Sequence, residues 1–222
     1  MAENDSLDWD FLKKTLYAAV VSDVLDSLGV TRRVPSAPLL QVSGSREYPL
    51  IGRCKTTLWA DMAHEDPKPY ALELRAVDSC RPGEILIAAA GGSTRSALWG
   101  ELLSTASMRT GCQGAIVDGL VRDQKKMEAI GFTVFCRGSS PLDSRDRQRV
   151  IDLDVAVEIG SARVCPGDLV IADADGLVFI PREVEGEVLK KALEKAIAEN
   201  TVRDAIRGGL SATDAFAKYG VL

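Results

Sequence analysis

Apolar runs of strand length alternate with helix-like segments in the middle of the chain, and this alternation constrains the fold more than any other feature. PGEILIA (82–88), GAIVD (114–118) and FTVFCRG (132–138) are each typical of a buried strand. The segments between them, RSALWGELLSTASMRTG (95–111) and QKKMEAIG (124–131), carry apolar residues at helical spacing and end in glycine. Strand–helix–strand units of this kind form parallel sheets with right-handed crossovers, so we predict an α/β fold.

The N-terminal part adds one helix and one strand to this unit. Residues 8–28 are predicted to form a single helix, because apolar residues recur at steps of four, with Ser6 or Asp8 as its N-cap. Residues 31–42 contain two prolines and little periodicity, which predicts an irregular connection. LIGRCKTTLWA (50–60) predicts a further strand.

The C-terminal part is predicted to be first β-rich and then helical. Residues 155–181 alternate short β runs with Gly and Asp turns, which indicates a meander or a small barrel-like sheet. Residues 182–222 form a helical extension, in which Ser211 is the N-cap of a last short helix. We therefore expect one domain over residues 1–222, with a central sheet or small barrel flanked by helices. A long helix leaving the end of a domain often packs on a neighbour, which favours an oligomer.

The composition limits the classes of partner. The chain has 222 residues, of which 46% are hydrophobic, and its formal net charge is -5. No dense basic run supplies the positive charge that nucleic-acid phosphates require, so we expect no nucleic-acid partner. A small anionic substrate would need only a local cation. No apolar run approaches the roughly 18 residues of a membrane span, and the N-terminus is acidic, so we expect a cytoplasmic protein without a membrane partner.

Three familiar kinds of site are poorly supported. The five cysteines never form a C-x-x-C pair, so neither a zinc site nor a disulfide framework is indicated, and most should be core thiols. The single histidine, His64, lies in a polar loop and is expected to be exposed, not part of a Ser-His-Asp relay. DADG (173–176) resembles the start of a calcium loop, but Val184 stands where the closing Glu would be, so we expect a hairpin turn.

The end of the strand at 114–118 is better evidence of a site. Asp118, Arg122 and Asp123 follow it, where functional loops of α/β units lie. A loop can direct the guanidinium of Arg122 at a carboxylate or enolate and the carboxylate of Asp123 at a metal ion. The alternative is a solvated helix N-terminus with Asp123 as cap, which would leave Arg122 unexplained. Asp118 could equally be a structural residue of an Asp-Gly turn.

ALWGELL (97–103) could supply the other half of such a site. Backbone N–H groups at a helix start, next to a glycine that lets a ligand approach, form an anion-binding site. The alternative assigns Leu98, Leu102 and Leu103 to the core and Gly100 to a helix-packing contact.

These motifs together resemble a known family. GELLSTASMRTGCQGAIVDGLVRD (100–123), followed by PGDLVIADADGLVFIP (166–181), is similar to the RraA-like family. That family joins class II 4-hydroxy-4-methyl-2-oxoglutarate aldolases to regulators of ribonuclease E activity, and the similarity runs from about residue 15 to about residue 210. The resemblance implies a swivelling β/β/α domain like the phosphohistidine domain. It also implies a homotrimer or homohexamer with active sites between subunits.

The resemblance implies a role for each motif residue. The backbone amides of Gly100, Glu101, Leu102 and Leu103 would bind the pyruvyl carboxylate, Arg122 would contact the 2-oxo group, and Asp123 would hold Mg²⁺ or Mn²⁺. Several aldolases have Asp where this chain has the longer Glu101. The base that removes the substrate proton is not identified: a water held by Glu101 or Asp118 is one candidate, and Glu199 of a neighbouring subunit could contribute.

The predicted function is that of a divalent-metal-dependent class II aldolase acting on a small anionic 2-oxo acid. Cleaving a 4-hydroxy-2-oxo acid, or removing CO₂ from oxaloacetate, yields the same pyruvate enolate, whose negative oxygen needs the cations of this site. The alternative is a non-enzymatic regulator of ribonuclease E activity that acts by protein–protein binding. A methyltransferase is disfavoured, because no Gly-rich S-adenosylmethionine loop follows the first strand.

Overall fold

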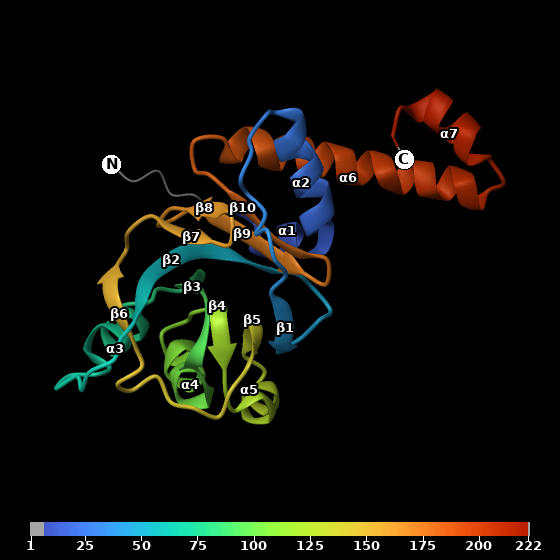
Figure 1. The fold of residues 1–222 in the computed structure, drawn as a ribbon. Coiled ribbons are helices and arrows are strands. Elements are labelled where there is room, and N and C mark those ends of the chain that lie inside the picture. The colour runs from blue at the N-terminus through green and yellow to red at the C-terminus, as the bar shows by residue number, and fades with distance from the viewer. Residues whose placement is uncertain (1–6, 222) are drawn as a thin grey trace.

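A strongly curved mixed sheet forms the centre of the protein, as the computed structural model of residues 7–221 shows (Figure 1). Its strands lie in the order β1-β5-β4-β3-β2-β9-β10, and β6 pairs with β2 outside this path. Their bounds are β1 (Leu40–Ser43), β2 (Leu50–Asp61), β3 (Glu84–Trp99), β4 (Gly114–Val121), β5 (Thr133–Ser139), β6 (Gln148–Leu153), β9 (Leu169–Asp173) and β10 (Gly176–Ile180). A small separate hairpin consists of β7 (Val157–Ile159) and β8 (Ala162–Val164).

Seven helices surround the sheet in the described part of the chain. They are α1 (Trp9–Thr15), α2 (Ala18–Ser27), α3 (Ala71–Asp78), α4 (Glu101–Arg109), α5 (Gln124–Ile130), α6 (Glu185–Arg207) and α7 (Ala212–Tyr219). The far end of α6 and all of α7 extend away from the body (Figure 1). The predicted α/β class, with a barrel-like sheet flanked by helices, is thereby confirmed. Among residues 7–221, no helix is both long enough and apolar enough to span a membrane.

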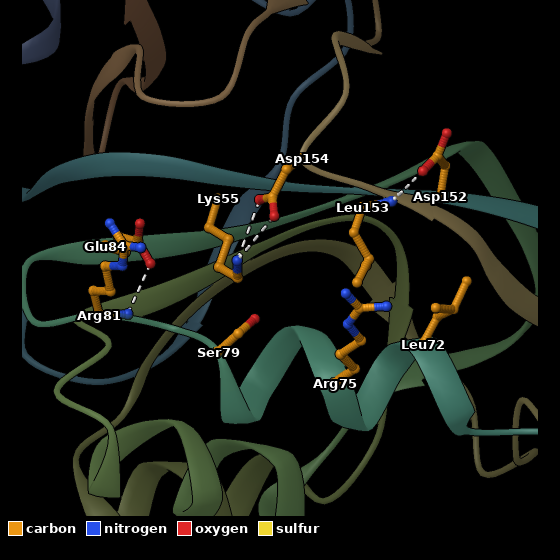
Figure 2. A pocket seen from close by; sticks show the side chains of 9 residues that line it. All are labelled: Lys55, Leu72, Arg75, Ser79, Arg81, Glu84, Asp152, Leu153 and Asp154. Carbon is orange, nitrogen blue, oxygen red and sulfur yellow. Dashed lines mark hydrogen bonds and ion pairs between the residues drawn. The ribbon is translucent and has the colours of Figure 1, made fainter.

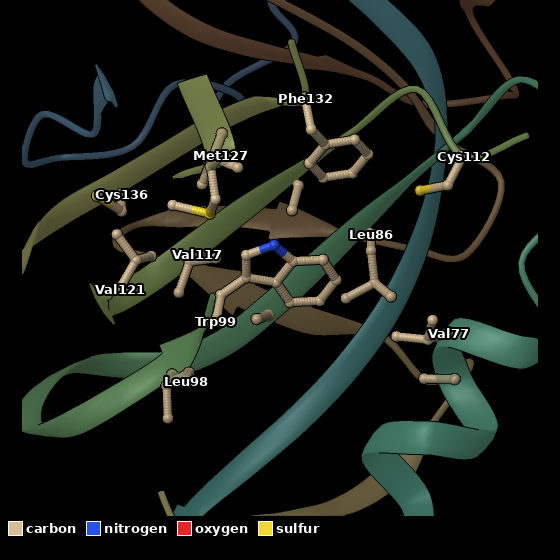
Figure 3. Close-up of a cluster of buried hydrophobic side chains, with 14 of the residues drawn as sticks. Val77, Leu86, Leu98, Trp99, Cys112, Val117, Val121, Met127, Phe132 and Cys136 are labelled. Carbon is tan, nitrogen blue, oxygen red and sulfur yellow. The ribbon is translucent and has the colours of Figure 1, made fainter. Parts of the chain in front are cut away.

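The predicted parallel unit is the part of the sheet that carries α4 and α5. β2, β3, β4 and β5 are parallel neighbours, with α4 between β3 and β4 and α5 between β4 and β5. Beneath these helices lies a buried cluster centred on Trp99, with Leu86, Val117, Met127 and Phe132 around its ring (Figure 3). The rings of Trp99 and Phe132 stack 6.3 Å apart. This cluster fixes the strand ends from which the site projects.

The predicted helix over residues 95–111 was wrong over residues 95–100. β3 continues to Trp99, and α4 begins only at Glu101. Gly91 and Gly92 take positive φ angles, so the strand bends and shifts its register where the sequence suggested a break. Leu98 and Trp99 are therefore core residues of a strand, while the predicted glycine end is confirmed, with Gly111 at φ +83° after the last turn.

The predicted N-terminal helix over residues 8–28 is two helices. Leu16 and Tyr17 are extended, and the chain restarts as α2 at Ala18, whose backbone N–H donates to Asp173 Oδ2 at 2.7 Å. Both helices bury apolar residues against β9, β10 and α6, which explains why the apolar pattern runs through the break. Asp8 caps α1 through the N–H of Phe11, and Ser6 lies outside the described residues.

Smaller differences concern edges and missed elements. Residues 31–42 are not irregular throughout, because β1 begins at Leu40 and pairs with β5. The strand at GAIVD continues to Val121. α3 and β6 were not predicted, because their short segments lie beside proline-rich or polar loops. The predicted meander is present as the β7–β8 and β9–β10 hairpins, and Ser211 caps α7 as expected.

Replacing Trp99 with Ala should destabilise the protein by about 3–5 kcal/mol, because it removes a fully buried ring from the centre of a core cluster. It also removes the hydrogen bond from Trp99 Nε1 to Ser104 Oγ, 2.8 Å long. Urea unfolding measures this change. Ile151→Ala is the matched control, since Ile151 is 48% exposed and its loss should cost less than about 0.5 kcal/mol. Equal losses in the two variants would contradict this description of the core.

Candidate active site

A pocket of about 280 Å³ opens where β3 and β4 end. Its walls come from α3, from the start of α4, from the residues after β4 and from the loop that follows β5. The lining residues are Tyr70, Glu73, Leu74, Ala97, Leu98, Trp99, Gly100, Glu101, Leu102, Leu103, Arg122, Asp123, Asp143 and Ser144. The pocket therefore unites the two sequence motifs, at 97–103 and 122–123, with two segments that the motifs did not indicate.

Gly100 joins the two motifs by allowing a close approach. The backbone N–H of Arg122 donates to the carbonyl of Trp99 at 2.9 Å, which holds the two chain segments together. A Cβ atom on residue 100 would lie 3.0 Å from Asp123 Oδ2 and 3.2 Å from Arg122 Cγ. Gly100 thus faces the charged pair. The alternative interpretation, in which it is a helix-packing contact, is not supported.

The first turn of α4 provides the backbone donors expected for an anion. Gly100 occupies the N-cap position, so no side chain caps the helix. The N–H groups at the start of a helix have no partner within it and lie at the positive end of its dipole. Leu102 is 77% exposed and does not belong to the core, whereas Leu98 is buried. The alternative assignment of this segment to the core therefore holds for Leu98 but not for Leu102.

Arg122 is held in place by Asp143. Its Nη2 lies 2.5 Å from Asp143 Oδ2, and the other oxygen of Asp143 accepts from the Tyr70 hydroxyl at 2.7 Å and from the Arg145 N–H at 2.8 Å. Burial alone would raise the pKa of Asp143, but these donors and the charge of Arg122 outweigh it and lower that pKa. Burial and the bond to Asp143 raise the pKa of Tyr70 to about 12. This network fixes the guanidinium at the pocket.

Asp123 lies directly before α5 but does not cap it. Its backbone is left-handed, with φ 59° and ψ 30°, and its side chain makes no capping hydrogen bond. Such a conformation is uncommon for a residue other than glycine and is found at functional sites. The carboxylate instead points toward Arg122, with Oδ2 4.0 Å from Nε, and it is 38% exposed. The interpretation of Asp123 as a helix cap is thus not supported.

Glu73 is a buried carboxyl in the pocket that was not predicted from the sequence. It is 7% exposed, and its Oε2 has no hydrogen-bond partner among the described residues. Burial, reinforced by the negative charge of Asp143 and partly opposed by Arg122, raises the pKa of Glu73 to about 8. One signal was present in the sequence: Glu73 stands three and four residues before Ala76 and Val77, on the apolar face of α3.

Two predicted site residues lie elsewhere. Asp118 is fully buried inside β4 and pairs with Arg137, while the N–H of Gly160 donates to it at 3.4 Å. It faces the β7–β8 hairpin and does not line the pocket of its own chain, and it lies inside a strand instead of in an Asp-Gly turn. Glu199, on α6, accepts a hydrogen bond from Tyr17 and is absent from the pocket of its own chain.

The structure also places the histidine, the cysteines and the DADG segment. His64 is exposed, and the five cysteines are free, with only Cys165 partly exposed. DADG joins β9 to β10 as a hairpin turn. Within residues 7–221, no three Asp, Glu, His or Cys side chains gather as a complete metal-ligand set.

The donors at the pocket nevertheless fit a hard divalent cation. Mg²⁺ is commonly held by one or two carboxylates together with water and substrate oxygens, without a full protein cage. Asp123 supplies a carboxylate beside a space that only a glycine at residue 100 leaves open. No sulfur or imidazole lines the pocket as described, which matches oxygen-preferring metals.

A second cavity, of about 500 Å³, lies between α3 and the strands β2 and β6 (Figure 2). Lys55 Nζ is buried there and lies 3.2 Å from Asp154 Oδ1. Arg75 and Arg81 line the cavity with it, but Glu84 and Asp152 do so as well. The three cations thus face three carboxylates, and no side-chain atom there is both buried and unpartnered among the residues described. We therefore assign the chemistry to the pocket at Arg122.

Comparisons with known proteins place these motifs in one family. The family model described as RraA-like, Aldolase/RraA, matches residues 18–179. A protein of Halalkalibacterium halodurans, provisionally named 4-hydroxy-4-methyl-2-oxoglutarate aldolase, is 31% identical over 143 residues, which cover 64% of this chain and 68% of that protein. A protein of Albidiferax ferrireducens with the same provisional name is 39% identical over 99 residues, 45% of this chain and 57% of that one.

The similarity extends to a solved structure. RraAS2 of Streptomyces coelicolor, described as an unusual member of the RNase ES inhibitor RraA protein family, superposes with a TM-score of 0.77. It is 26% identical, and the match covers 91% of this chain and 98% of that one.

Asp118→Ala should act on stability and not on chemistry. Removing one partner of a buried ion pair leaves Arg137 uncompensated and should cost about 3–5 kcal/mol in urea unfolding. Asp118→Ala combined with Arg137→Met should regain part of that loss, because the unpaired cation is gone. Asp152→Ala, at an exposed position, is the control. A variant as stable as the wild type would show that the Asp118–Arg137 pair does not form.

Proposed function

The chain belongs to the RraA-like family, and on this basis we propose that it is a divalent-metal-dependent class II aldolase. Its substrates would be 4-hydroxy-2-oxo acids of the 4-hydroxy-4-methyl-2-oxoglutarate type, cleaved to pyruvate through the pyruvate enolate. Oxaloacetate decarboxylation would proceed through the same enolate. The observation that carries the proposal is the convergence of the helix start at Gly100 with the anchored guanidinium of Arg122 in one pocket.

Each part of the pocket supplies one requirement of this reaction. The backbone N–H groups of residues 101–103 bind the substrate carboxylate, because a helix start favours anions. Arg122 places a fixed positive charge where the 2-oxo oxygen gains negative charge as the C3–C4 bond breaks. Asp143 keeps the guanidinium oriented before substrate arrives, so little reorganisation is needed. Glu101 lines the pocket but accepts a hydrogen bond from Thr105 at 2.8 Å within its own helix.

Asp123 would hold Mg²⁺ or Mn²⁺. The bound ion would act as a Lewis acid toward the 2-oxo oxygen. Among the described residues no lysine lines this pocket, while Lys125 and Lys126 line an adjoining cavity that shares Arg122 and Asp123. In the proposed route, Arg122 and the helix start act on a substrate whose carbonyl is not modified by the protein.

We also propose that the pocket is completed by a neighbouring copy in a homotrimer or homohexamer. Leu74 and Leu102 line the pocket and are 50% and 77% exposed, so a second subunit could cover an apolar rim. Glu199 lies on α6, whose far end projects from the body (Figure 1), and within its own chain it accepts a hydrogen bond from Tyr17. A location in the cytoplasm and the absence of nucleic-acid and membrane partners stay predictions.

Pyruvate release should depend on a divalent metal. A panel of 4-hydroxy-2-oxo acids and oxaloacetate, coupled to pyruvate detection, should show activity that EDTA abolishes and Mg²⁺ or Mn²⁺ restores, because Asp123 offers only hard oxygen ligands. Asp123→Asn should need more metal for the same rate. Full activity after exhaustive chelation would contradict the metal-dependent route. A metal-replete protein inactive on the whole panel would instead favour the ribonuclease regulator.

Arg122→Lys should lower activity strongly, even though the substitution keeps the positive charge. Lysine lacks the planar fork that Asp143 orients and does not reach the same position. We expect kcat to fall by about 10²–10³, as for loss of an oxyanion-hole donor. Arg109→Lys is the control, because Arg109 is 75% exposed and pairs with Asp78 outside the pocket. A raised KM with unchanged kcat would mean that Arg122 binds only the ground state.

A further inference from the structure

Glu73 is the one acid of the pocket whose position has no structural explanation. Its side chain lies on α3 among the buried residues of that helix, 7% exposed, with Oε2 bonded to no other described group. A buried polar group without a partner costs free energy, and native proteins rarely keep one. A residue retained in this state within a concave pocket is a candidate for proton transfer.

The proposed cleavage needs a proton acceptor that the motif residues do not supply. The hydroxyl on C4 must lose its proton as the C3–C4 bond breaks, and a proton must then reach C3 of the enolate. Asp143 is occupied by Arg122, Tyr70 and the Arg145 backbone, and these donors stabilise its charged form. Asp118 does not line the pocket.

Two other acids lining the pocket have other partners. Asp123 lies beside Arg122 and is the proposed metal ligand. Glu101 is bonded to Thr105 through Oε1. Among the acids that line the pocket, Glu73 alone combines burial with an oxygen that has no hydrogen-bond partner. Two charged side chains act on Glu73 from other segments: Asp143 raises its pKa and Arg122 lowers it.

We propose that Glu73 is the general acid–base of the aldol cleavage. This role rests on the proposed function. The Glu73 carboxylate takes the proton of the 4-hydroxyl, whose O–H electron pair forms the new carbonyl. The C3–C4 pair moves into the enolate, and the protonated Glu73 then donates the same proton to C3. One proton is taken and returned, so pyruvate and the second carbonyl product form without any further reactant.

The surroundings of Glu73 suit both halves of this cycle. Burial and the charge of Asp143 favour its neutral form, while Arg122 favours the charged form. Its pKa of about 8 lies close to neutral pH, where an acid–base group can both accept and donate a proton. Since the carboxylate is the acting form, aldol cleavage should rise with pH and level off above about 8.

Substrate choice separates this role from a structural one. Decarboxylation of oxaloacetate has no hydroxyl proton to remove before its C–C bond breaks. In the metal-replete protein, Glu73→Gln should lower kcat for a 4-hydroxy-2-oxo acid by about 10²–10⁴. Oxaloacetate decarboxylation should retain at least an order of magnitude more of its rate. Glu73→Asp should keep part of the aldol activity and its pH dependence, which Glu73→Gln should lose.

Thermal unfolding gives a readout independent of activity. The folded pKa of Glu73 lies above its unfolded value, so its contribution to stability is present at low pH and is lost as pH rises toward about 8. The melting temperature of Glu73→Gln should therefore gain on that of the wild type between about pH 5 and pH 9. This gain would also show that the variant folds.

The outcomes are distinguishable. Selective loss of aldol cleavage, with the relative gain in stability at high pH, supports Glu73 as the acid–base group. Equal losses on both substrates, or no loss on either, overturn this role while the proposed function stands. A wild type that releases pyruvate from neither substrate overturns the proposed function and this role together.

Discussion

The parallel pairing of the ends of β3 and β4 is the constraint on which the site depends. Trp99 and Val121 are paired in register, and the Arg122 N–H continues the contact to the Trp99 carbonyl at 2.9 Å. This contact sets the start of α4 next to Arg122 and Asp123. The absence of a side chain at Gly100 lets the two segments meet without a clash. A buried tryptophan on one side and an open glycine on the other thus define the pocket.

The polar groups of the pocket have fewer hydrogen-bond partners than those of the core beneath it. Trp99 is fully buried and hydrogen-bonded, whereas Glu73 has an unpartnered oxygen and Asp123 holds a left-handed backbone. Such features cost stability and are enriched at functional sites. In contrast, Asp118 is fully buried and is paired with the partly exposed Arg137, which is why we assign this pair to stability.

Local patterns in the sequence predicted the parallel unit and the residues at its ends. Arg122 and Asp123 follow the predicted end of a strand, so their place at the site could be anticipated. Gly100 lay inside the helix predicted over 95–111, and only the structure shows that the helix begins at Glu101. Asp118 could not be placed in the same way, because strand alternation turns it toward the β7–β8 hairpin. The helix over 95–111 was mistaken because an apolar run with glycines suits either a bent strand or a helix.

The remaining site residues could not be predicted from the sequence for a different reason. Glu73 and Tyr70 come from α3 and its preceding turn, and Asp143 from a loop after β5, so only tertiary packing unites them.

Enolate formation in this pocket is the central claim. Proton NMR of pyruvate in D₂O with protein and Mg²⁺ tests it directly. We predict metal-dependent exchange of the methyl protons, strongly reduced in Gly100→Ala, whose Cβ would meet Asp123 Oδ2 at 3.0 Å. Exchange no faster than in protein-free solution would contradict the account.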